Sequence, residues 1–171
     1  MNIAITGFMA SGKSQISIEL AKVLGYKLVD TDEEIERTAN MSINEIFAKY
    51  GEEYFRNLES EVCKKISLID KTIISTGGGL VLRKQNVDEL RKNATIVNLD
   101  ADFSVIESRI NKAAATRPLM KGSTVEELKQ RFEDRKPFYE NCDIKVKVTN
   151  KKNPYEQAKM IIKELRRKNL I

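Results

Sequence analysis

Gly7-Phe8-Met9-Ala10-Ser11-Gly12-Lys13-Ser14 is the stretch that decides the fold of this 171-residue chain. It satisfies the pattern GxxxxGK[ST], in which glycines let backbone N–H groups approach the oxygens of a phosphate. In such a loop Lys13 bridges the β- and γ-phosphates of a nucleotide, and Ser14 can ligate Mg²⁺. An ordinary glycine-containing turn is the alternative. The match at all eight positions favours a binding site for a nucleoside triphosphate.

The residues on either side of this loop have the character that the pattern requires. Asn2–Thr6 is a short apolar run with β-branched residues, which predicts a buried strand before the loop. From Lys13 onward apolar residues recur at helical spacing, and Gly25 ends that helix. We therefore expect a strand, a phosphate-binding loop and a helix in this order, with ATP and Mg²⁺ as ligands.

The rest of the chain alternates between predicted strands and predicted helices. Further strands are predicted at 27–29, 72–75, 95–99 and 144–148. Further helices are predicted at about 42–50, 52–68, 86–92, 102–109 and 124–136, and from 153 onward. Pro137 is expected to stop the 124–136 helix. Residues 111–123 lack apolar periodicity, so a mobile loop is expected there.

This order of elements predicts the fold class. Because helices separate most of the strands, each crossover returns the chain to the same end of the sheet and the strands pair in parallel. The expected fold is α/β, a three-layer α/β/α sandwich with a five-stranded parallel sheet and the P-loop architecture of nucleoside-monophosphate kinases. Ligands are then expected at the carboxyl ends of the strands.

The composition limits the class of protein. With 41% hydrophobic and 32% charged residues, the chain can bury one core and cover it with charge. It has no apolar run of the ~18 residues that a membrane span requires. The two cysteines lie far apart and histidine is absent, which argues against a zinc site and against a disulfide framework. We expect a cytoplasmic protein that is not exported.

The formal charge of +5 suggests a polyanionic partner, but its distribution weakens that interpretation. Nine Lys/Arg and three Asp/Glu lie in residues 143–171, which leaves 21 bases and 22 acids in residues 1–142. A nucleic-acid-associated ATPase with a basic C-terminus is therefore an alternative with little support. A solvated basic face is the simpler explanation, and we expect neither nucleic-acid nor membrane binding.

The phosphate-binding loop alone leaves kinases, GTPases and other ATPases open. The guanine-reading tetrad NKxD is absent, because Asn150-Lys151-Lys152-Asn153 lacks the aspartate. A kinase of small molecules is therefore favoured. Asp30 and Asp32, at the end of the second strand, can hold Mg²⁺ and orient a hydroxyl nucleophile if that strand lies beside the first. Helix capping is the alternative role for this acidic pair.

Two arginines have neighbours that suggest a second ligand. Arg56 lies on a helix with large apolar residues, and Arg135 precedes Lys136-Pro137-Phe138-Tyr139. A guanidinium binds a carboxylate through two parallel hydrogen bonds, so the pair suits a small carboxylate. For either arginine alone, an ion pair on a helix surface is the alternative.

Six motifs together resemble the shikimate kinase family over essentially the whole chain. They are GFMASGKS (7–14), DTD (30–32), FRNLE (55–59), STGGG (75–79), TRPLM (116–120) and DRKPFY (134–139). The resemblance implies a single domain, 1–171, with substrate-binding helices at about 32–69 and a mobile lid at about 111–123. It also implies transfer of the γ-phosphoryl group of ATP to the 3-hydroxyl of shikimate, a step of aromatic amino-acid biosynthesis, by a monomer.

The resemblance also assigns roles to residues. It implies that Lys13, Asp32 and Arg117 are catalytic and that Ser14 and Asp30 hold Mg²⁺. The implied substrate contacts are Asp32, Arg56, Gly77, Gly78, Gly79 and Arg135. The implied nucleotide contacts are Ala10, Ser11, Gly12, Lys13, Ser14, Gln15, Arg109, Arg117, Lys152 and Pro154.

This sequence departs from the family pattern at two of these positions. Ala10 stands where members commonly have glycine, so we expect its φ to be negative. Lys152 stands where an arginine is common. Two alternatives to this function remain: another small P-loop kinase, for gluconate or a nucleoside monophosphate, and a nucleotide-dependent binding module without catalysis.

Overall fold

The computed structural model describes residues 1–116 and 123–171, with side chains for 1–113 and 123–171. Its five strands are β1 (Asn2–Thr6), β2 (Lys27–Asp30), β3 (Thr72–Ser75), β4 (Ala94–Ala101) and β5 (Ile144–Val148). Its α-helices are α1 (Lys13–Leu24), α2 (Thr31–Ala39), α3 (Ile43–Ser67), α4 (Lys84–Arg91), α5 (Phe103–Thr116), α6 (Val125–Glu140) and α7 (Pro154–Arg167). A short 3₁₀ helix, η1, spans Leu80–Leu82.

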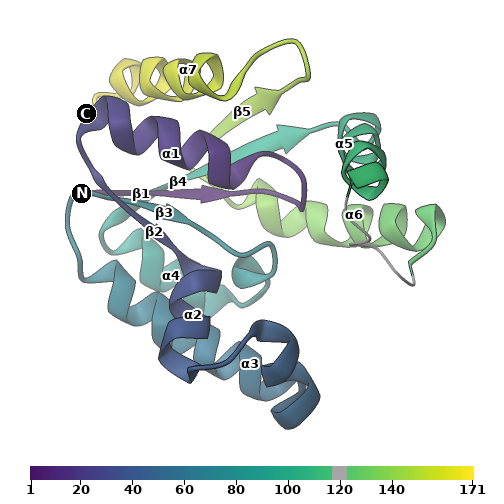
Figure 1. The fold of residues 1–171 in the computed structure, drawn as a ribbon. Coiled ribbons are helices and arrows are strands. Elements are labelled where there is room, and N and C mark those ends of the chain that lie inside the picture. The colour runs from purple at the N-terminus through teal and green to yellow at the C-terminus, as the bar shows by residue number, and fades with distance from the viewer. Residues whose placement is uncertain (117–122) are drawn as a thin grey trace.

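All the strand pairs are parallel, and the order in the sheet is β2-β3-β1-β4-β5. Figure 1 shows α1 and α7 on one face of the sheet and α3, α4 and α6 on the other. The predicted three-layer α/β/α fold is therefore confirmed. The central strands β1 and β3 are buried along their whole length, as strands covered by helices on both faces must be.

The position of β2 differs from the simplest expectation. β3 lies between β1 and β2, so the strand that ends at Asp30 is not a neighbour of β1. Its carboxyl end nevertheless points to the same edge of the sheet as the loop after β1, because all the strands run in one direction. Asp30 and Asp32 reach the phosphate-binding loop across the end of β3.

The predicted helix starts are confirmed by their caps. Ser42, Thr124 and Asn153 each accept a hydrogen bond through the side chain from the backbone N–H three residues on, and the glutamate at that position accepts one from the backbone N–H of the cap residue. Such reciprocal capping satisfies N–H groups that have no partner inside the helix. Within α3, Gly51 has φ 82° and ψ 176°, which divides the helix into the two parts that the sequence predicts.

Two helices run further than the sequence predicts. Residues 111–116 belong to α5, although a loop was expected there. α6 continues through Pro137 to Glu140, although Pro137 was expected to stop it. The lid expected at 111–123 falls partly on 117–122, which lie outside the described residues.

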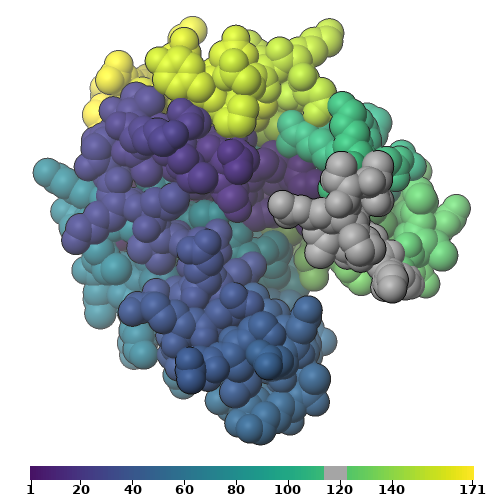
Figure 2. Space-filling view, viewed as in Figure 1, coloured from purple at the N-terminus to yellow at the C-terminus, as the bar shows by residue number. Residues whose placement is uncertain are grey.

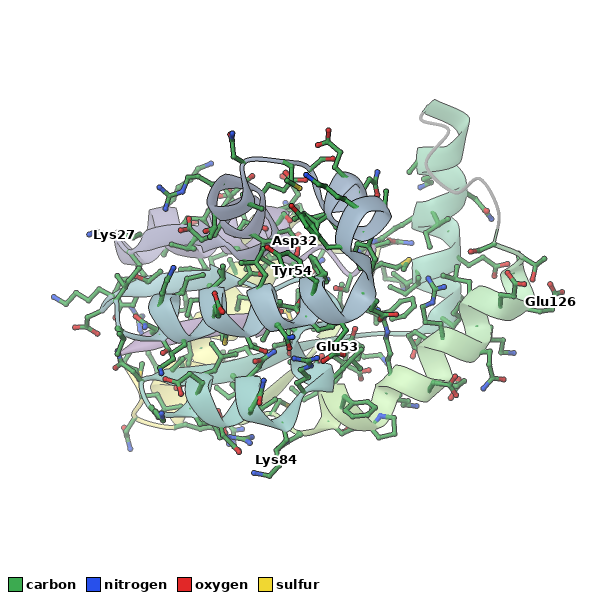
Figure 3. All side chains as sticks on the ribbon, turned by 90° about the horizontal axis from the view of Figure 1, so that it is seen from below. Lys27, Asp32, Glu53, Tyr54, Lys84 and Glu126 are labelled. Atoms are coloured by element: carbon green, nitrogen blue, oxygen red, sulfur yellow. The ribbon has the colours of Figure 1, made fainter. Side chains whose placement is uncertain are left out.

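Both outer strands of the sheet carry exposed lysines. β5 alternates strictly between buried and exposed residues, and Lys145 and Lys147 are its exposed positions. Lys27 is exposed at the start of β2 on the opposite edge. Figure 3 shows Lys27 pointing away from the molecule. The inner strands β3, β1 and β4, by contrast, each have a neighbouring strand on both sides.

Neither cysteine is in a disulfide bond: Cys63 is buried and Cys142 is half-buried. Burial raises the pKa of the Cys63 thiol to about 12. No helix in the described part of the chain combines the length and the apolar character that a membrane span requires.

Candidate active site

A cleft opens at the carboxyl ends of the strands. Figure 2 shows the surface hollowed between the first strand and helix and the lobe that α2 and the start of α3 form below them. The cleft has a volume of about 380 Å³. Its polar lining comes from Lys13, Ser14, Asp30, Asp32, Arg56, Glu59, Thr76, Gly77, Gly78, Gly79 and Arg135. The structure thus brings nearly all the predicted substrate, metal and catalytic residues into one cavity.

Lys13 of the phosphate-binding loop is hydrogen-bonded to backbone carbonyl groups of the same loop. The Lys13 ammonium donates to the carbonyl oxygens of Gly7 (2.8 Å) and Phe8 (3.0 Å). Burial lowers the pKa of Lys13 to about 8, and the nearby carboxylates of Asp32 and Asp30 partly oppose that shift. Phosphate oxygens would favour the charged form, so this lysine is placed to meet a polyanion.

One residue of the loop contradicts its prediction. Ala10 has φ 59°, in the left-handed region, although a negative φ was expected. A left-handed conformation is unfavourable for a residue with a Cβ. The carbonyl oxygen of Ala10 accepts a hydrogen bond from Arg109 at 3.0 Å, which helps to hold this conformation.

Asp30 serves as a helix cap and faces the cleft at the same time. One carboxylate oxygen accepts from the backbone N–H groups of Asp32 (2.9 Å) and Glu33 (3.4 Å), and the other accepts from the Ser75 hydroxyl (2.9 Å). The capping role considered for this residue is confirmed, and its metal-holding role stays a prediction. Because both oxygens already have partners, Asp30 is better placed to accept from a metal-bound water than to coordinate a metal directly.

Asp32 lines the cleft. Figure 3 shows it among the side chains between α2 and α3. Burial raises the pKa of its carboxyl group, the negative charge of Asp30 adds to the effect, and Lys13 acts in the opposite direction. A carboxylate with a raised pKa is a stronger base than one in water, which suits it to accept a proton from a hydroxyl group.

The donor set fits Mg²⁺ shared with a nucleotide. Ser14 contributes a hydroxyl and Asp30 a carboxylate to the same cavity. Among the described residues no group of three or more carboxylates, histidines or cysteines could hold a metal. Mg²⁺ commonly takes one or two protein oxygens and completes its shell with water and phosphate oxygens. Ser14 and Asp30 match that pattern.

The glycines after β3 leave room for charged side chains. A Cβ on Gly77 would lie 2.5 Å from a carboxylate oxygen of Asp32, and a Cβ on Gly79 would lie 2.5 Å from Nη2 of Arg56. Both distances are far below van der Waals contact. The need for glycine at these positions therefore comes first from Asp32 and Arg56, and not only from the substrate ring.

Arg56 is fixed by a residue that the sequence analysis did not assign. Its Nη1 donates to Glu59 at 2.8 Å, and Glu59 is only 1% exposed. Burial raises the pKa of Glu59, while the hydrogen bond and the charge of Arg56 lower it. The spacing of Arg56 and Glu59 at i and i+3 was visible in the sequence, but the burial of the pair was not.

A second cavity of about 300 Å³ lies beyond the loop. Its lining residues are Ala10, Gly12, Gln15, Ile16, Arg109, Lys152, Pro154 and Gln157. Six of the predicted nucleotide contacts are among them: Ala10, Gly12, Gln15, Arg109, Lys152 and Pro154. Arg109 also donates to Asn150 Oδ1 at 3.0 Å, which links α5 to the turn before α7.

Gln157 is a further residue of this cavity that the sequence did not indicate. Its side-chain amide donates to the carbonyl oxygens of Thr149 (3.2 Å) and Lys152 (2.7 Å) and thereby shapes the turn. Its position on the buried face of α7 gave no signal of such a role.

One predicted residue is not brought to the cleft surface. Ser11 is 1% exposed, and its hydroxyl has no hydrogen-bond partner in the described part of the chain. Only its backbone N–H is therefore suited to contact a phosphate. Arg117 lies outside the described residues, so its predicted role stays a prediction.

Comparison with known proteins gives consistent matches. Residues 9–166 match the family described as shikimate kinase. The shikimate kinase of Thermodesulfovibrio yellowstonii is 41% identical over 167 residues, which cover 97% of this chain and 95% of that protein. The crystal structure of shikimate kinase from Aquifex aeolicus has a TM-score of 0.84 and 36% identity, and the match covers 99% of both chains. Shikimate kinase from Acinetobacter baumannii in complex with shikimate has a TM-score of 0.88 and 27% identity, covering 99% of this chain and 95% of that one.

Proposed function

This chain belongs to the shikimate kinase family, and we propose that its central cleft carries out the whole reaction of that family. The enzyme transfers the γ-phosphoryl group of ATP to the 3-hydroxyl of shikimate, a step of aromatic amino-acid biosynthesis. One observation carries the assignment of residues: Lys13 and Asp32, suited to phosphoryl transfer, share a cavity with Arg56 and Arg135, suited to a carboxylate.

Arg56 and Arg135 bind the carboxylate of shikimate in this proposal. They come from α3 and α6 and meet at the loop of Gly77, Gly78 and Gly79. A guanidinium and a carboxylate form two parallel hydrogen bonds, so two arginines fix both the position and the orientation of the ring. A nucleotide acceptor such as AMP would instead require a pocket that reads a base.

Asp32 accepts the proton of the 3-hydroxyl. As the proton moves to an Asp32 carboxylate oxygen, the substrate oxygen forms a bond to the γ-phosphorus, the bond from that phosphorus to the β,γ-bridging oxygen breaks, and ADP leaves. Lys13 stabilises the charge on the phosphate oxygens. Little covalent chemistry falls to the protein, so positioning and electrostatic stabilisation provide the rate enhancement.

Ser14 and Asp30 are the residues that would hold Mg²⁺. The metal supplies positive charge at the phosphates when bound. The protein's own contribution is to fix the two oxygens: Asp30 is held by Ser75 and by the first turn of α2. Arg117 is proposed to add a further positive charge to the transferred group.

Arg109, Lys152 and Pro154 bind the adenine side of ATP, together with backbone groups from Ala10 to Gln15. The support is that these residues line one cavity together with Ala10 and Gly12 of the phosphate-binding loop, and that this cavity shares no lining residue with the cleft of Asp32. ATP bound there would place its phosphates at the N-terminus of α1, where the helix dipole favours negative charge.

We further propose a cytoplasmic monomer, 1–171, in which the region 32–69 binds substrate and 111–123 acts as a lid. One chain supplies both cavities, so no second copy is needed to complete the site. Size-exclusion chromatography with light scattering checks the monomer. Hydrogen exchange with and without ATP and shikimate checks the lid, because closure would slow exchange there.

A single assay tests the function. ADP release is measured with ATP, Mg²⁺ and shikimate, and separately with gluconate, with AMP and with no acceptor. The expected result is turnover that depends on shikimate, with a phosphate monoester of shikimate detected by ³¹P NMR. Turnover with gluconate or AMP at an equal or higher rate would overturn the assignment of the acceptor. Absence of turnover together with tight ATP binding would favour the non-catalytic binding module.

A further inference from the structure

Tyr139 is a buried residue beside the cleft to which the proposed mechanism gives no role. Its hydroxyl donates a 2.6 Å hydrogen bond to the carbonyl oxygen of Gly78, 61 residues away in the sequence. The side chain is 7% exposed. This bond ties the last turn of α6 to the middle glycine of the loop after β3.

Arg135 lies one helical turn before Tyr139, on the same face of α6. A Cβ built on Gly78 would lie 3.6 Å from Nη1 of Arg135 and 3.7 Å from the Tyr139 hydroxyl. The middle glycine therefore packs against both side chains at once. Burial raises the pKa of Tyr139, while the charge of Arg135 and a hydrogen bond from it act in the opposite direction.

The turn that carries Tyr139 has a weakened backbone. Pro137 lies inside α6 and has no N–H to donate to the preceding turn. The Tyr139–Gly78 hydrogen bond and the burial of the Tyr139 ring attach this last turn of α6 to the glycine loop and so compensate for the missing backbone hydrogen bond. Arg135, on the adjoining turn of α6, packs against the same glycine, Gly78.

We propose that Tyr139 is a positioning residue for the substrate carboxylate: it locks Gly78 and Arg135 into one unit, so that the glycine loop and α6 present a single preformed pocket. The inference rests on the proposed function. Tyr139 is not among the residues that line the cleft with Lys13 and Asp32, so its effect falls on substrate binding and not on the chemical step.

The test is a double-mutant cycle of Tyr139→Phe and Arg135→Ala in the full-length enzyme. Turnover of shikimate by the wild-type enzyme is measured first. If there is none, the proposed function is refuted, which is a different result from a failure of the role assigned to Tyr139. Tyr139→Phe is expected to raise the shikimate KM about 5- to 10-fold, the effect of losing one buried hydrogen bond, with kcat and the ATP KM changed less than about 2-fold. Tyr26→Phe, which removes the same atom from a half-buried tyrosine between α1 and β2, is the matched control and leaves all three constants unchanged.

The double variant decides the mechanism. If Tyr139 acts through Arg135, adding Tyr139→Phe to Arg135→Ala raises the KM by less than about 2-fold beyond Arg135→Ala alone. Multiplication of the two single effects would overturn the proposal, as would an unchanged KM in Tyr139→Phe or equal changes in kcat and KM.

If Tyr139→Phe does not fold, 3-fluorotyrosine at position 139 replaces it. That residue keeps the ring and makes the hydroxyl a stronger donor, and a shikimate KM no different from that of the same replacement at Tyr26 would overturn the proposal.

Discussion

Arg56 and Glu59 form an ion pair at 2.8 Å, less than one turn apart on α3, with Arg56 12% exposed and Glu59 1% exposed. The arginine has a second, weaker partner in Glu52 at 3.8 Å, which is 71% exposed. Arg56 also packs against Gly79, and the bond to Glu59 holds its guanidinium beside that glycine.

The first prediction concerns this pair. Glu59→Ala leaves Arg56 largely buried without its main partner and is expected to lower the free energy of unfolding by about 3 kcal/mol. The shikimate KM should rise about tenfold, because the guanidinium is no longer held in place. Glu52→Ala is the matched control and should cost no more than about 0.5 kcal/mol, since an exposed pair contributes little. Urea unfolding and steady-state kinetics check both values; equal costs for the two variants would contradict the prediction.

Asp32→Asn should separate stability from activity. In the folded protein the pKa of Asp32 is raised, so the folded state binds the proton more tightly than the unfolded state does. The ionised carboxylate therefore destabilises the fold progressively as the pH rises from the ordinary carboxyl pKa through the raised one. Asparagine removes that cost, so Tm should rise at pH 8 and should rise less at pH 4, whereas kcat falls at least about 100-fold.

Thermal unfolding and initial rates measure the two effects of Asp32→Asn. In the wild type, the acid side of the kcat profile should titrate above the ordinary pKa of an aspartate. Glu33→Gln, at an exposed carboxylate one residue on, serves as control and should change neither kcat nor its pH profile. A lower Tm for Asp32→Asn at pH 8 would show that Asp32 is a structural residue.

Alanine at Gly77 and at Gly79 should harm different steps. At Gly77 the new Cβ displaces the Asp32 carboxylate, so kcat should fall with a smaller change in the shikimate KM. At Gly79 it displaces the Arg56 guanidinium, so the KM should rise with a smaller change in kcat. At Gly77 the displaced group is the end of the Asp32 side chain, so Tm should change little, whereas at Gly79 the Arg56–Glu59 ion pair is disturbed and Tm should fall. At Gly78 the contacts are at 3.6 Å or more, and an effect there would report contact with the substrate itself.

ATP binding should take up a proton at alkaline pH. Burial lowers the pKa of free Lys13 to about 8, and phosphate oxygens favour the charged form. Between pH 7 and pH 9 the affinity for ATP should therefore fall about tenfold through this group. Calorimetry in two buffers of different ionisation enthalpy measures the proton uptake. Lys13→Arg keeps its charge over this range, so its affinity should not show the same fall; an identical fall would exclude Lys13 as the source.

Gly51 and Gly25 offer a matched test of backbone strain. A Cβ would meet no atom within 4 Å at either position, so only the backbone conformation differs. Gly51 lies at φ 82° and ψ 176°, a region that side chains essentially exclude, and alanine there should cost about 1–3 kcal/mol. Gly25, at φ 67° and ψ 28°, is in the ordinary left-handed region, where alanine should cost about 1 kcal/mol.

Function should also distinguish the two glycines. Gly51 joins the helical segment of Phe47 to that of Phe55, and both rings line the cleft. Gly51→Ala should raise the shikimate KM, and Gly25→Ala should leave it unchanged. Guanidinium chloride unfolding and kinetics measure both; equal stability costs at the two positions would contradict the assigned strain.

The layers of the fold and most of the site could be predicted because their signals are local. The phosphate-binding loop, the glutamate-containing caps and the short β-branched runs each express a physical requirement within a few residues. The order of the strands is not local. The position of β3 between β1 and β2 is set by packing between segments far apart in the chain, so the sequence left open whether the second strand lies beside the first.

The two helix ends that were predicted wrongly have different causes. The segment 111–116 contains three consecutive alanines, the residue of highest helix propensity, but it has no apolar stripe. Periodicity detects a helix that buries one face, and it overlooks one that does not. At Pro137 the local rule against proline was outweighed by a distant contact, the burial of Tyr139 against Gly78.

The residues that could not be predicted are those whose role is to hold another residue of the site in place. Glu59 and Tyr139 stood inside motifs that were noticed, but nothing local distinguishes a buried glutamate or tyrosine from an exposed one. Ala10 was expected at a negative φ because its residue type prefers it. In the structure its φ is positive, and the hydrogen bond from Arg109 to its carbonyl oxygen offsets part of the cost of that conformation.

The exposed lysines on the outer strands concern how copies of the enzyme meet one another. A strand with an open edge can pair with the edge of a second chain, and such pairing leads to aggregation. Lys145 and Lys147 on β5, and Lys27 on β2, place charged side chains on both open edges. Part of the basic charge near the C-terminus thus acts against self-association through the sheet. Replacing Lys145 and Lys147 with threonine would remove that charge from the β5 edge and favour pairing of β5 with a strand of another molecule.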